Sequence, residues 1–284
     1  MSAAEPAPGY DDDFLGAPTA VPIPADGRVL RELTYVHFTV LLDPARRLAV
    51  ATGVNIDGSA LRDVARSDDW RLDPRVGADE QAGPDLYRDN DLDRGHLVRR
   101  SDPVWGAPAV AEQADRDTFS YANAAPQAAQ FNQSMELWLG LEDYVLTHAD
   151  TYDTKLSVFT APVLADDDPR YRGVGIPRLF WKVAAWSAPG PDGEPGVAAT
   201  GYVLDQTPQL DDIDFSDVGE PPAADPPPLG PFRTFQVPVE DIAVLTGLDL
   251  GPLVAADRFA APAPVGVGPR DRWVPLGSLT EVRL

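Results

Sequence analysis

The chain has 284 residues, of which 44% are hydrophobic and 24% charged, so it can bury a core of its own in one large domain or two small ones. It contains no cysteine, which excludes disulfides, thiolate metal sites and cysteine nucleophiles. Its formal charge of −22 argues against broad electrostatic binding to nucleic acid or to an anionic membrane.

The sequence shows no feature that would direct it into or across a membrane. No run of about 18 apolar residues is present, and the N-terminus has no basic segment followed by an apolar one. We therefore expect no membrane partner and no secretory signal. The location is unknown: the cytoplasm is the default expectation, and a leaderless or cleaved secreted form is the alternative.

The first part of the chain predicts an arm followed by a hairpin. Residues 1–30 are too proline-broken for a helix and too polar for a core strand, which favours an extended arm. Within this arm, Phe14 and Leu15 are either a short hydrophobic anchor or part of a flexible leader. The β-branched and aromatic runs Leu33–Val40 and Leu48–Val54, joined through Asp43 and Pro44, predict an antiparallel hairpin.

The remaining elements predict an α+β fold. Residues 62–95 show no sustained periodicity, so we expect loops with short pieces of structure there. Helices are predicted at 107–117 and, with apolar residues at spacings of three and four, at about 128–148. Strand-like runs at 156–162, 178–186 and 197–204 complete a mostly antiparallel sheet flanked by helices. We expect one domain over 31–284, with an acidic, proline-rich loop at about 205–231.

The strongest chemical signal is the stretch Asp93-Arg94-Gly95-His96. Imidazole can take a proton from water near neutral pH, and a guanidinium offers paired donors to phosphate oxygens. His96 is therefore a candidate general base for phosphodiester hydrolysis. A lone histidine among arginines is more often a surface residue or a satisfied core residue, so the neighbouring motifs decide between these interpretations.

Several further motifs accompany this stretch in a consistent order. They are Asn55 to Gly58, Trp70 to Pro74, Phe119 to Gln127, Phe131 to Gln133, Trp138 to Glu142 and Val158 to Pro162. Together with Asp93 to His96, they resemble the DNA/RNA non-specific endonucleases. This is the ββα-metal nuclease family, which includes secreted bacterial nucleases and mitochondrial endonuclease G. The resemblance covers about residues 10–260 and implies the ββα-metal nuclease fold.

The resemblance implies an endonuclease that depends on Mg²⁺, with Mn²⁺ as a substitute, and that cleaves DNA and RNA with little sequence preference. Asn132 then corresponds to the metal ligand, because an amide oxygen holds the ion without cancelling its charge. His96 would deprotonate water and Arg94 would hold the phosphate. Asn123 would position the base or the substrate, and Glu142 would hold metal-bound water.

Three of these roles have alternatives in the residues themselves. Asn132 also suits the cap of the helix that follows it, and Asn123 also suits hydrogen bonding to loop backbone. Glu142 lies two residues further from Asn132 than the family's glutamate lies from its asparagine. Two residues rotate a helical side chain by about 200°, so Glu136 is an alternative for the water-holding role.

The arginine pattern also departs from that of the secreted enzymes. Where they carry a phosphate-binding arginine before the Trp70 motif, this chain has Asp68 and Asp69. Arg66 or Arg71 would have to replace it. His37, on a predicted strand, and His148, at a helix end, are expected to be structural and are not assigned to the site.

DNA and RNA are the expected partners, and the sequence leaves open a homodimer and an inhibitor protein. The rival interpretation is a catalytically weak or inactive nuclease-fold protein that acts by binding, suggested by the charge of −22 and the missing arginines. Retention of Arg94, His96 and Asn132 argues against it, because binding alone requires neither a base nor a metal ligand. A calcium-binding module built on Asp11–Asp13 or Asp166–Asp168 is disfavoured, because neither run has spaced oxygen ligands and a glycine.

Overall fold

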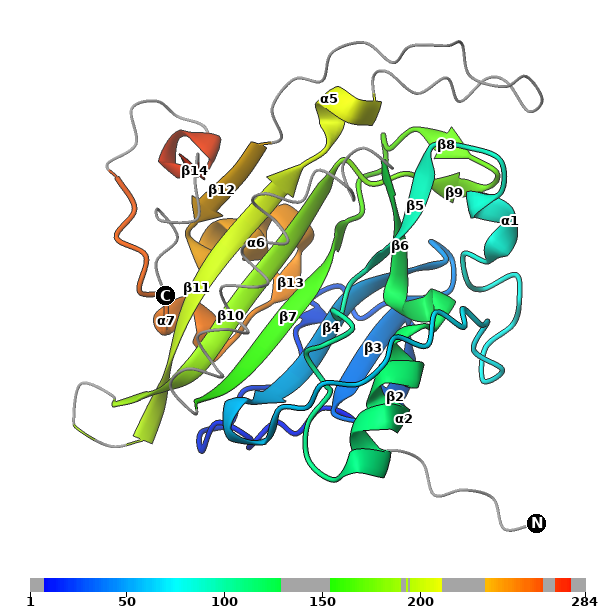
Figure 1. Ribbon diagram of the computed structural model, residues 1–284. Coiled ribbons are helices and arrows are strands. Elements are labelled where there is room, and N and C mark those ends of the chain that lie inside the picture. The colour runs from blue at the N-terminus through cyan, green and yellow to red at the C-terminus, as the bar shows by residue number, and fades with distance from the viewer. Residues whose placement is uncertain are drawn as a thin grey trace.

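The computed structural model describes residues 8–128, 154–189, 193, 195–210, 233–262 and 269–276. Eight strands form the central sheet: β2 (Arg31–Tyr35), β3 (Phe38–Asp43), β4 (Leu48–Asp57), β7 (Lys155–Val163), β10 (Leu179–Pro189), β11 (Pro195–Asp205), β12 (Arg233–Val237) and β14 (Val274–Leu276). Their order across the sheet is β14-β12-β11-β10-β7-β4-β3-β2, and every neighbouring pair is antiparallel (Figure 1).

Short ribbons and helices cover this sheet. The ribbons pair β1 (Ile23–Pro24) with β13 (Leu248–Asp249), β5 (Leu92–His96) with β6 (Ala124–Ala128), and β8 (Arg170–Tyr171) with β9 (Val174–Gly175). The described helices are α1 (Pro84–Tyr87), α2 (Pro108–Thr118), α5 (Thr207–Leu210), α6 (Val239–Thr246) and α7 (Pro252–Ala255), with 3-10 turns η1 (Gly58–Ala60), η2 (Tyr121–Asn123) and η3 (Pro269–Arg272). None of these helices is long and apolar enough to cross a membrane.

Both faces of the sheet are buried, which explains the near-continuous apolar runs of its central strands. Along β10, Phe180 and Ala184 join one core cluster, whereas Trp181 and Val183 join the other, as the two-residue period of a strand requires. The first cluster includes buried residues of α1, β5 and β6, and the second those of α6 and α7. The β5–β6 ribbon is thereby packed onto one face of the sheet (Figure 1).

Residues 8–30 lie against the sheet. The backbone of Gly9 bonds to Tyr35, and Tyr10 and Leu15 are buried in the second core cluster with Phe14 packed beside them. The amide side chain of Asn55 accepts a hydrogen bond from the backbone N–H of Asp11 at 2.7 Å. Within the described part of the arm, Phe14 and Leu15 therefore act as a hydrophobic anchor.

The prediction of a single strand over Leu33–Val40 is wrong. The chain reverses between Tyr35 and Phe38, so the first half of the run is β2 and the second half starts β3, which pairs with β4. The run contains no glycine, proline, asparagine or aspartate to mark the turn. His37 adopts φ +66° at this turn, a conformation in which histidine is enriched among non-glycine residues.

His37 is a packing residue, as predicted, but it lies in the turn between β2 and β3 and not within a strand. Its ring stacks on that of Trp105 with the centroids 3.4 Å apart and an interplanar angle of 7°. Its Nδ1 lies 2.8 Å from the carbonyl oxygen of Pro103, the contact of a hydrogen bond donated by the imidazole. These contacts fix the β2–β3 turn against the loop that precedes α2.

The other predicted elements agree with the described structure. The helix predicted at 107–117 is α2, and the three predicted strands are β7, β10 and β11. Ala128 ends β6, and the rest of the helix predicted at about 128–148 lies outside the described residues. Of the acidic segment at 205–231, the described part is the end of β11 and α5.

Candidate active site

His96 is the last residue of β5. In the β5–β6 ribbon it lies opposite Ala124, and Gly95 lies opposite Ala125. A side chain at position 95 would collide with Gln127, because a Cβ there would lie 2.1 Å from the Cδ atom of Gln127. Gln127 is itself buried. Glycine at position 95 therefore permits the close packing that holds the end of β5.

Asn123 holds the backbone of Leu97 and Val98, the two residues that follow His96. Its Oδ1 accepts a hydrogen bond from the N–H of Val98 at 2.9 Å, and its Nδ2 donates to the carbonyl oxygens of Val98 at 2.9 Å and Thr118 at 3.0 Å. Its own carbonyl accepts from the N–H of Leu97. The fully buried side chain thus bonds to backbone, the alternative that the sequence left open, and it fixes the position of His96 through the two residues that follow.

Aromatic rings surround the imidazole. The ring of Trp70 lies 4.7 Å from that of His96, and the ring of Phe119 meets it edge-on at 5.0 Å. Trp70 also contacts Phe119 and Tyr121, with centroid distances of 5.4 and 5.7 Å. The Nε2 atom of His96 is buried and has no hydrogen-bond partner among the described residues. Since buried polar atoms are rarely left unpaired, this nitrogen is a candidate for chemistry.

Two arginines stack on the same rings. The Cζ atom of Arg94 lies 5.3 Å from the centroid of Trp70, and that of Arg66 lies 5.3 Å from the centroid of Phe119. These are cation–π distances, in which the ring face attracts the guanidinium. Each of the two cations therefore lies over a different aromatic neighbour of His96.

The surroundings keep His96 neutral. Burial, first of all, lowers the pKa of the imidazole to about 3. The positive charges of Arg66, Arg100 and Arg94 act in the same direction, and the carboxylate of Asp68 opposes them. A neutral imidazole can accept a proton, so the site keeps His96 in the form that a general base requires.

Helix α2 holds the segment that carries Arg66. The Nη1 of Arg100 donates to Asp115 and to the carbonyl oxygen of Val64, each at 3.0 Å. The other carboxylate oxygen of Asp115 accepts from the N–H of Ser67 at 3.1 Å. Asp115 is buried, so this ion pair and its two backbone bonds fix residues 64–67 beside the imidazole.

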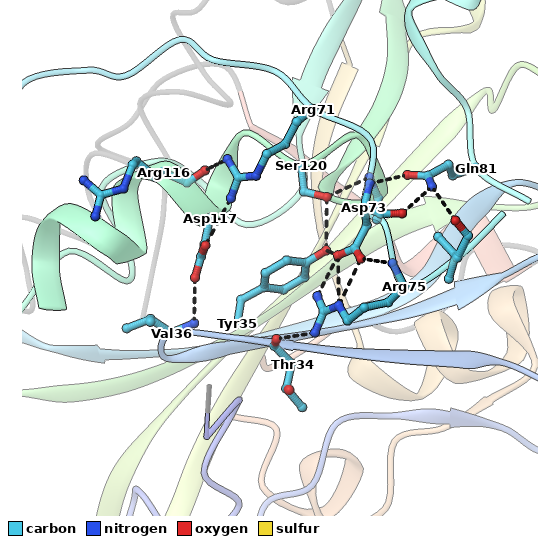
Figure 2. A network of polar contacts seen from close by, with 12 residues as sticks. Thr34, Tyr35, Val36, Arg71, Asp73, Arg75, Gln81, Arg116, Asp117 and Ser120 are labelled. Atoms are coloured by element: carbon cyan, nitrogen blue, oxygen red, sulfur yellow. Dashed lines mark hydrogen bonds and ion pairs between the residues drawn. The ribbon is translucent and has the colours of Figure 1, made fainter. Parts of the chain in front are cut away.

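The structure separates the two arginines that were candidates for a phosphate contact. Arg71 donates to the carbonyl oxygen of Arg116 and to the carboxylate of Asp117 at 3.1 Å (Figure 2). Asp117 also accepts from the backbone N–H of Val36. Asp117 therefore joins Arg71 to the β2–β3 turn, whereas Arg66 lies over Phe119 in the site itself.

A polar network holds the segment that follows Trp70 in the chain, around Asp73 (Figure 2). The hydroxyl of Tyr35 donates to Asp73 at 2.6 Å and lies 3.0 Å from that of Ser120, while Arg75 donates to both carboxylate oxygens of Asp73. Burial alone would raise the pKa of Asp73, but the hydrogen bonds from Arg75 and Tyr35 outweigh it and lower the pKa. The side chain of Gln81 bonds to both backbone groups of Asp73: its oxygen accepts from the N–H of Asp73, and its nitrogen donates to the carbonyl oxygen.

Asn132, Glu142 and the alternative Glu136 lie outside the described residues. The part of the chain that the structure describes contains no group of three or more histidine, cysteine, aspartate or glutamate residues that could hold a metal. Mg²⁺ keeps several waters and accepts few protein ligands, of which an amide oxygen is one acceptable kind. The described residues thus offer no carboxylate cage, and the unpaired Nε2 of His96 is a polar atom of the candidate site that they leave without a partner.

Comparisons with known proteins identify the family. The family model of the DNA/RNA non-specific endonucleases matches residues 19–257, so the chain belongs to that family. An uncharacterized protein of Sinorhizobium fredii, y4fB, is 38% identical over 90% of this chain and 40% of its own length. Mitochondrial endonuclease G is 28% identical in both Bos taurus and Homo sapiens, over 77% and 67% of this chain and 68% and 59% of those proteins. The chain thus spans less than two thirds of the rhizobial and human relatives.

A solved structure confirms the fold. The crystal structure of the EndoG/EndoGI complex matches with a TM-score of 0.56 at 18% identity, over 78% of this chain and 86% of that chain. The predicted mostly antiparallel ββα-metal nuclease fold is therefore correct. His96 and Arg94 lie in it on β5 of the β5–β6 ribbon, in a stretch for which the sequence predicted no strand.

Several residues that build the site carry no signal of their role in the sequence. Trp70 and Phe119 belong to the sequence motifs, but the motifs do not indicate that their rings contact the imidazole of His96. Asp115 and Asp117, the partners of Arg100 and Arg71, were not identified at all. Asp115 and Asp117, four and two residues before Phe119, offer a weak signal, because only their burial reveals that they are structural partners.

Proposed function

We propose that this chain is a metal-dependent endonuclease that hydrolyses phosphodiester bonds of DNA and RNA with His96 as its general base. Family membership supports the reaction class. The observation that carries the assignment is the unpaired Nε2 of His96, held neutral between the rings that bear Arg66 and Arg94.

In this proposal His96 takes a proton from the water that attacks phosphorus. Arg94 and Arg66 bind the non-bridging phosphate oxygens, to which a guanidinium can donate two parallel hydrogen bonds. Asn123 positions the base by fixing the backbone at Val98. Mg²⁺, held by Asn132 with Glu142 or Glu136 bonding to its water, would supply positive charge to the phosphate and the departing oxygen.

The expected lack of sequence preference has a physical basis in these contacts. Arginines that bind phosphate contact a group that every nucleotide shares, in DNA as in RNA. A homodimer and an inhibitor protein remain predictions, and the match to a structure that concerns inhibition of EndoG supports the second.

The test is plasmid nicking with Mg²⁺ and with EDTA, using the wild type, His96→Ala and the matched control His37→Asn. Removal of a general base should lower the rate about 10²- to 10⁴-fold. His37→Asn should keep most of the activity, because His37 packs on Trp105 and asparagine tolerates its positive φ. Asn132→Ala should shift the Mg²⁺ requirement to higher concentration.

The result also separates the proposal from its rival. A wild type that binds DNA and nicks none of it with Mg²⁺ or Mn²⁺ would identify an inactive nuclease-fold binding protein. Equal loss of activity in the His96 and His37 variants would mean that both act through folding, which unfolding curves of the two proteins would show.

A further inference from the structure

Arg66 and Asp68 form an ion pair at the edge of the site. The Nη2 of Arg66 lies 3.2 Å from the Oδ1 of Asp68, and both side chains are more than half exposed. Asp68 adopts φ +54°, a conformation that aspartate tolerates better than most residues, and this turn brings its carboxylate back to the guanidinium. Among the described residues, Asp68 is the one carboxylate paired with Arg66.

This pair lies within electrostatic reach of the base. The guanidinium of Arg66 stacks on Phe119, whose ring meets that of His96. Arg66 and Asp68 also shift the pKa of His96 in opposite directions, as charges close to the imidazole do. Arg100 differs, because its partner Asp115 is buried and also bonds to backbone.

We propose that Asp68 occupies the guanidinium of Arg66 in the free protein and competes with the substrate phosphate for it, so that this carboxylate limits the affinity for nucleic acid. The inference rests on the proposed function, in which Arg66 contacts phosphate. Carboxylate and phosphate oxygens use the same donors of a guanidinium, so one occupant excludes the other. An exposed ion pair contributes little stability, which allows a phosphate to displace it.

The experiment compares Asp68→Asn with Asp69→Asn. Both variants remove one negative charge from adjacent exposed positions, but Asp69 makes no ion pair among the described residues. Asparagine keeps the shape of Asp68 and tolerates its positive φ. The dissociation constant of a short labelled single-stranded oligodeoxynucleotide is measured by fluorescence anisotropy in EDTA at ~0.15 M salt, where charges are screened beyond about 8 Å.

Asp68→Asn should tighten binding about 1.5- to 5-fold, the range set by an exposed ion pair, and Asp69→Asn should tighten it less. In Mg²⁺, KM for cleavage should fall by a similar factor. In an Arg66→Ala background the two variants should become equal, because the competition requires the guanidinium. Equal tightening by both variants in the wild-type background, or an Asp68→Asn effect that persists without Arg66, would overturn the inference.

The outcomes distinguish this inference from the proposed function. If the wild type binds the oligonucleotide but does not cleave with Mg²⁺, the proposed nuclease activity fails, and the binding comparison still tests the role of Asp68. If the wild type cleaves and Asp68→Asn leaves both KM and the dissociation constant unchanged, the inference alone fails.

Discussion

The ring of Phe119 meets the imidazole of His96 at an interplanar angle of 88°, with the centroids 5.0 Å apart. Phe119 directly follows α2, and its carbonyl accepts a hydrogen bond from the backbone N–H of Arg71. The orientation of His96, the proposed base, therefore depends on two segments outside β5: the end of α2 and the loop around Trp70. Substitutions that move either segment should affect the chemistry without touching substrate.

Gly95→Ala should destabilise the β5–β6 ribbon. The added Cβ would meet the buried side chain of Gln127, and overpacking of a filled core costs about 1 to 3 kcal/mol. The double variant Gly95→Ala, Gln127→Ala should recover part of this loss, because the clashing atoms are gone. Urea unfolding of the two single variants and the double variant gives the coupling. Simple additivity would contradict a clash between these two residues.

The cleavage rate should remain high well into the acid range. The pKa of His96 lies at about 3, below the ordinary 6.5, so the free protein keeps its base neutral far below pH 6. The acid limb of kcat/KM, which reports the free enzyme, should therefore fall below about pH 5. Rates measured at saturating Mg²⁺ from acid to neutral pH test this. A limb centred near pH 6.5 would show that the imidazole titrates as an exposed one.

The same shift predicts how stability depends on pH. Below about pH 6.5 the unfolded chain protonates His96 and the folded protein does not, so stability falls as the pH decreases from about 6.5 toward 3. His96→Gln removes this dependence. The wild type should lose stability relative to His96→Gln between about pH 7.5 and pH 5, measured by urea unfolding. An unchanged difference at the two pH values would exclude a depressed pKa.

Asp115→Ala should weaken both fold and activity. It removes a buried partner of Arg100 and the acceptor for Ser67, and breaking a buried ion pair costs about 3 kcal/mol. The segment that carries Arg66 would be released, so the rate should also fall. Glu112→Ala, at an exposed position of the same helix, is the control. Equal stability of the two variants would mean that α2 does not fix this segment.

Asp73→Asn should destabilise the protein at neutral pH by about 2 kcal/mol, because Arg75 and Tyr35 lose their charged partner. The lowered pKa of Asp73 means that the folded state holds the carboxylate ionised more strongly than the unfolded state. This stability is present above the ordinary pKa of 3.8 and is lost as the pH falls through the lower folded value.

The difference between the wild type and Asp73→Asn should therefore shrink in acid. Asp79→Asn, an exposed carboxylate in the same loop, controls for net charge and should behave like the wild type. A difference that stays constant down to about pH 2.5 would mean that packing, rather than charge, connects Asp73 to its partners.

The sequence by itself determined the fold class, most strands of the central sheet and α2, and it singled out His96 as the candidate base. These follow from local chemistry: β-branched and aromatic runs form strands, and a proline at the first turn begins α2. The prediction of one strand over Leu33–Val40 was wrong, because the chain turns at His37 and histidine is not one of the residues that mark a turn in a sequence. The helix expected to carry Asn132 and Glu142 lies outside the described residues.

Only the tertiary structure decided which residues surround the base. Trp70 and Phe119 are far from His96 in the chain, and their ring contacts depend on how loops pack over the sheet. The choice between Arg66 and Arg71 was likewise open, because two arginines on one loop have the same local chemistry. Burial of Asp117 beside Arg71 makes that arginine structural, and the aromatic face of Phe119 places the other in the site. The hydrophobic periodicity of a sequence predicts which side of a helix or strand is buried, whereas contacts between distant segments form only when the chain folds.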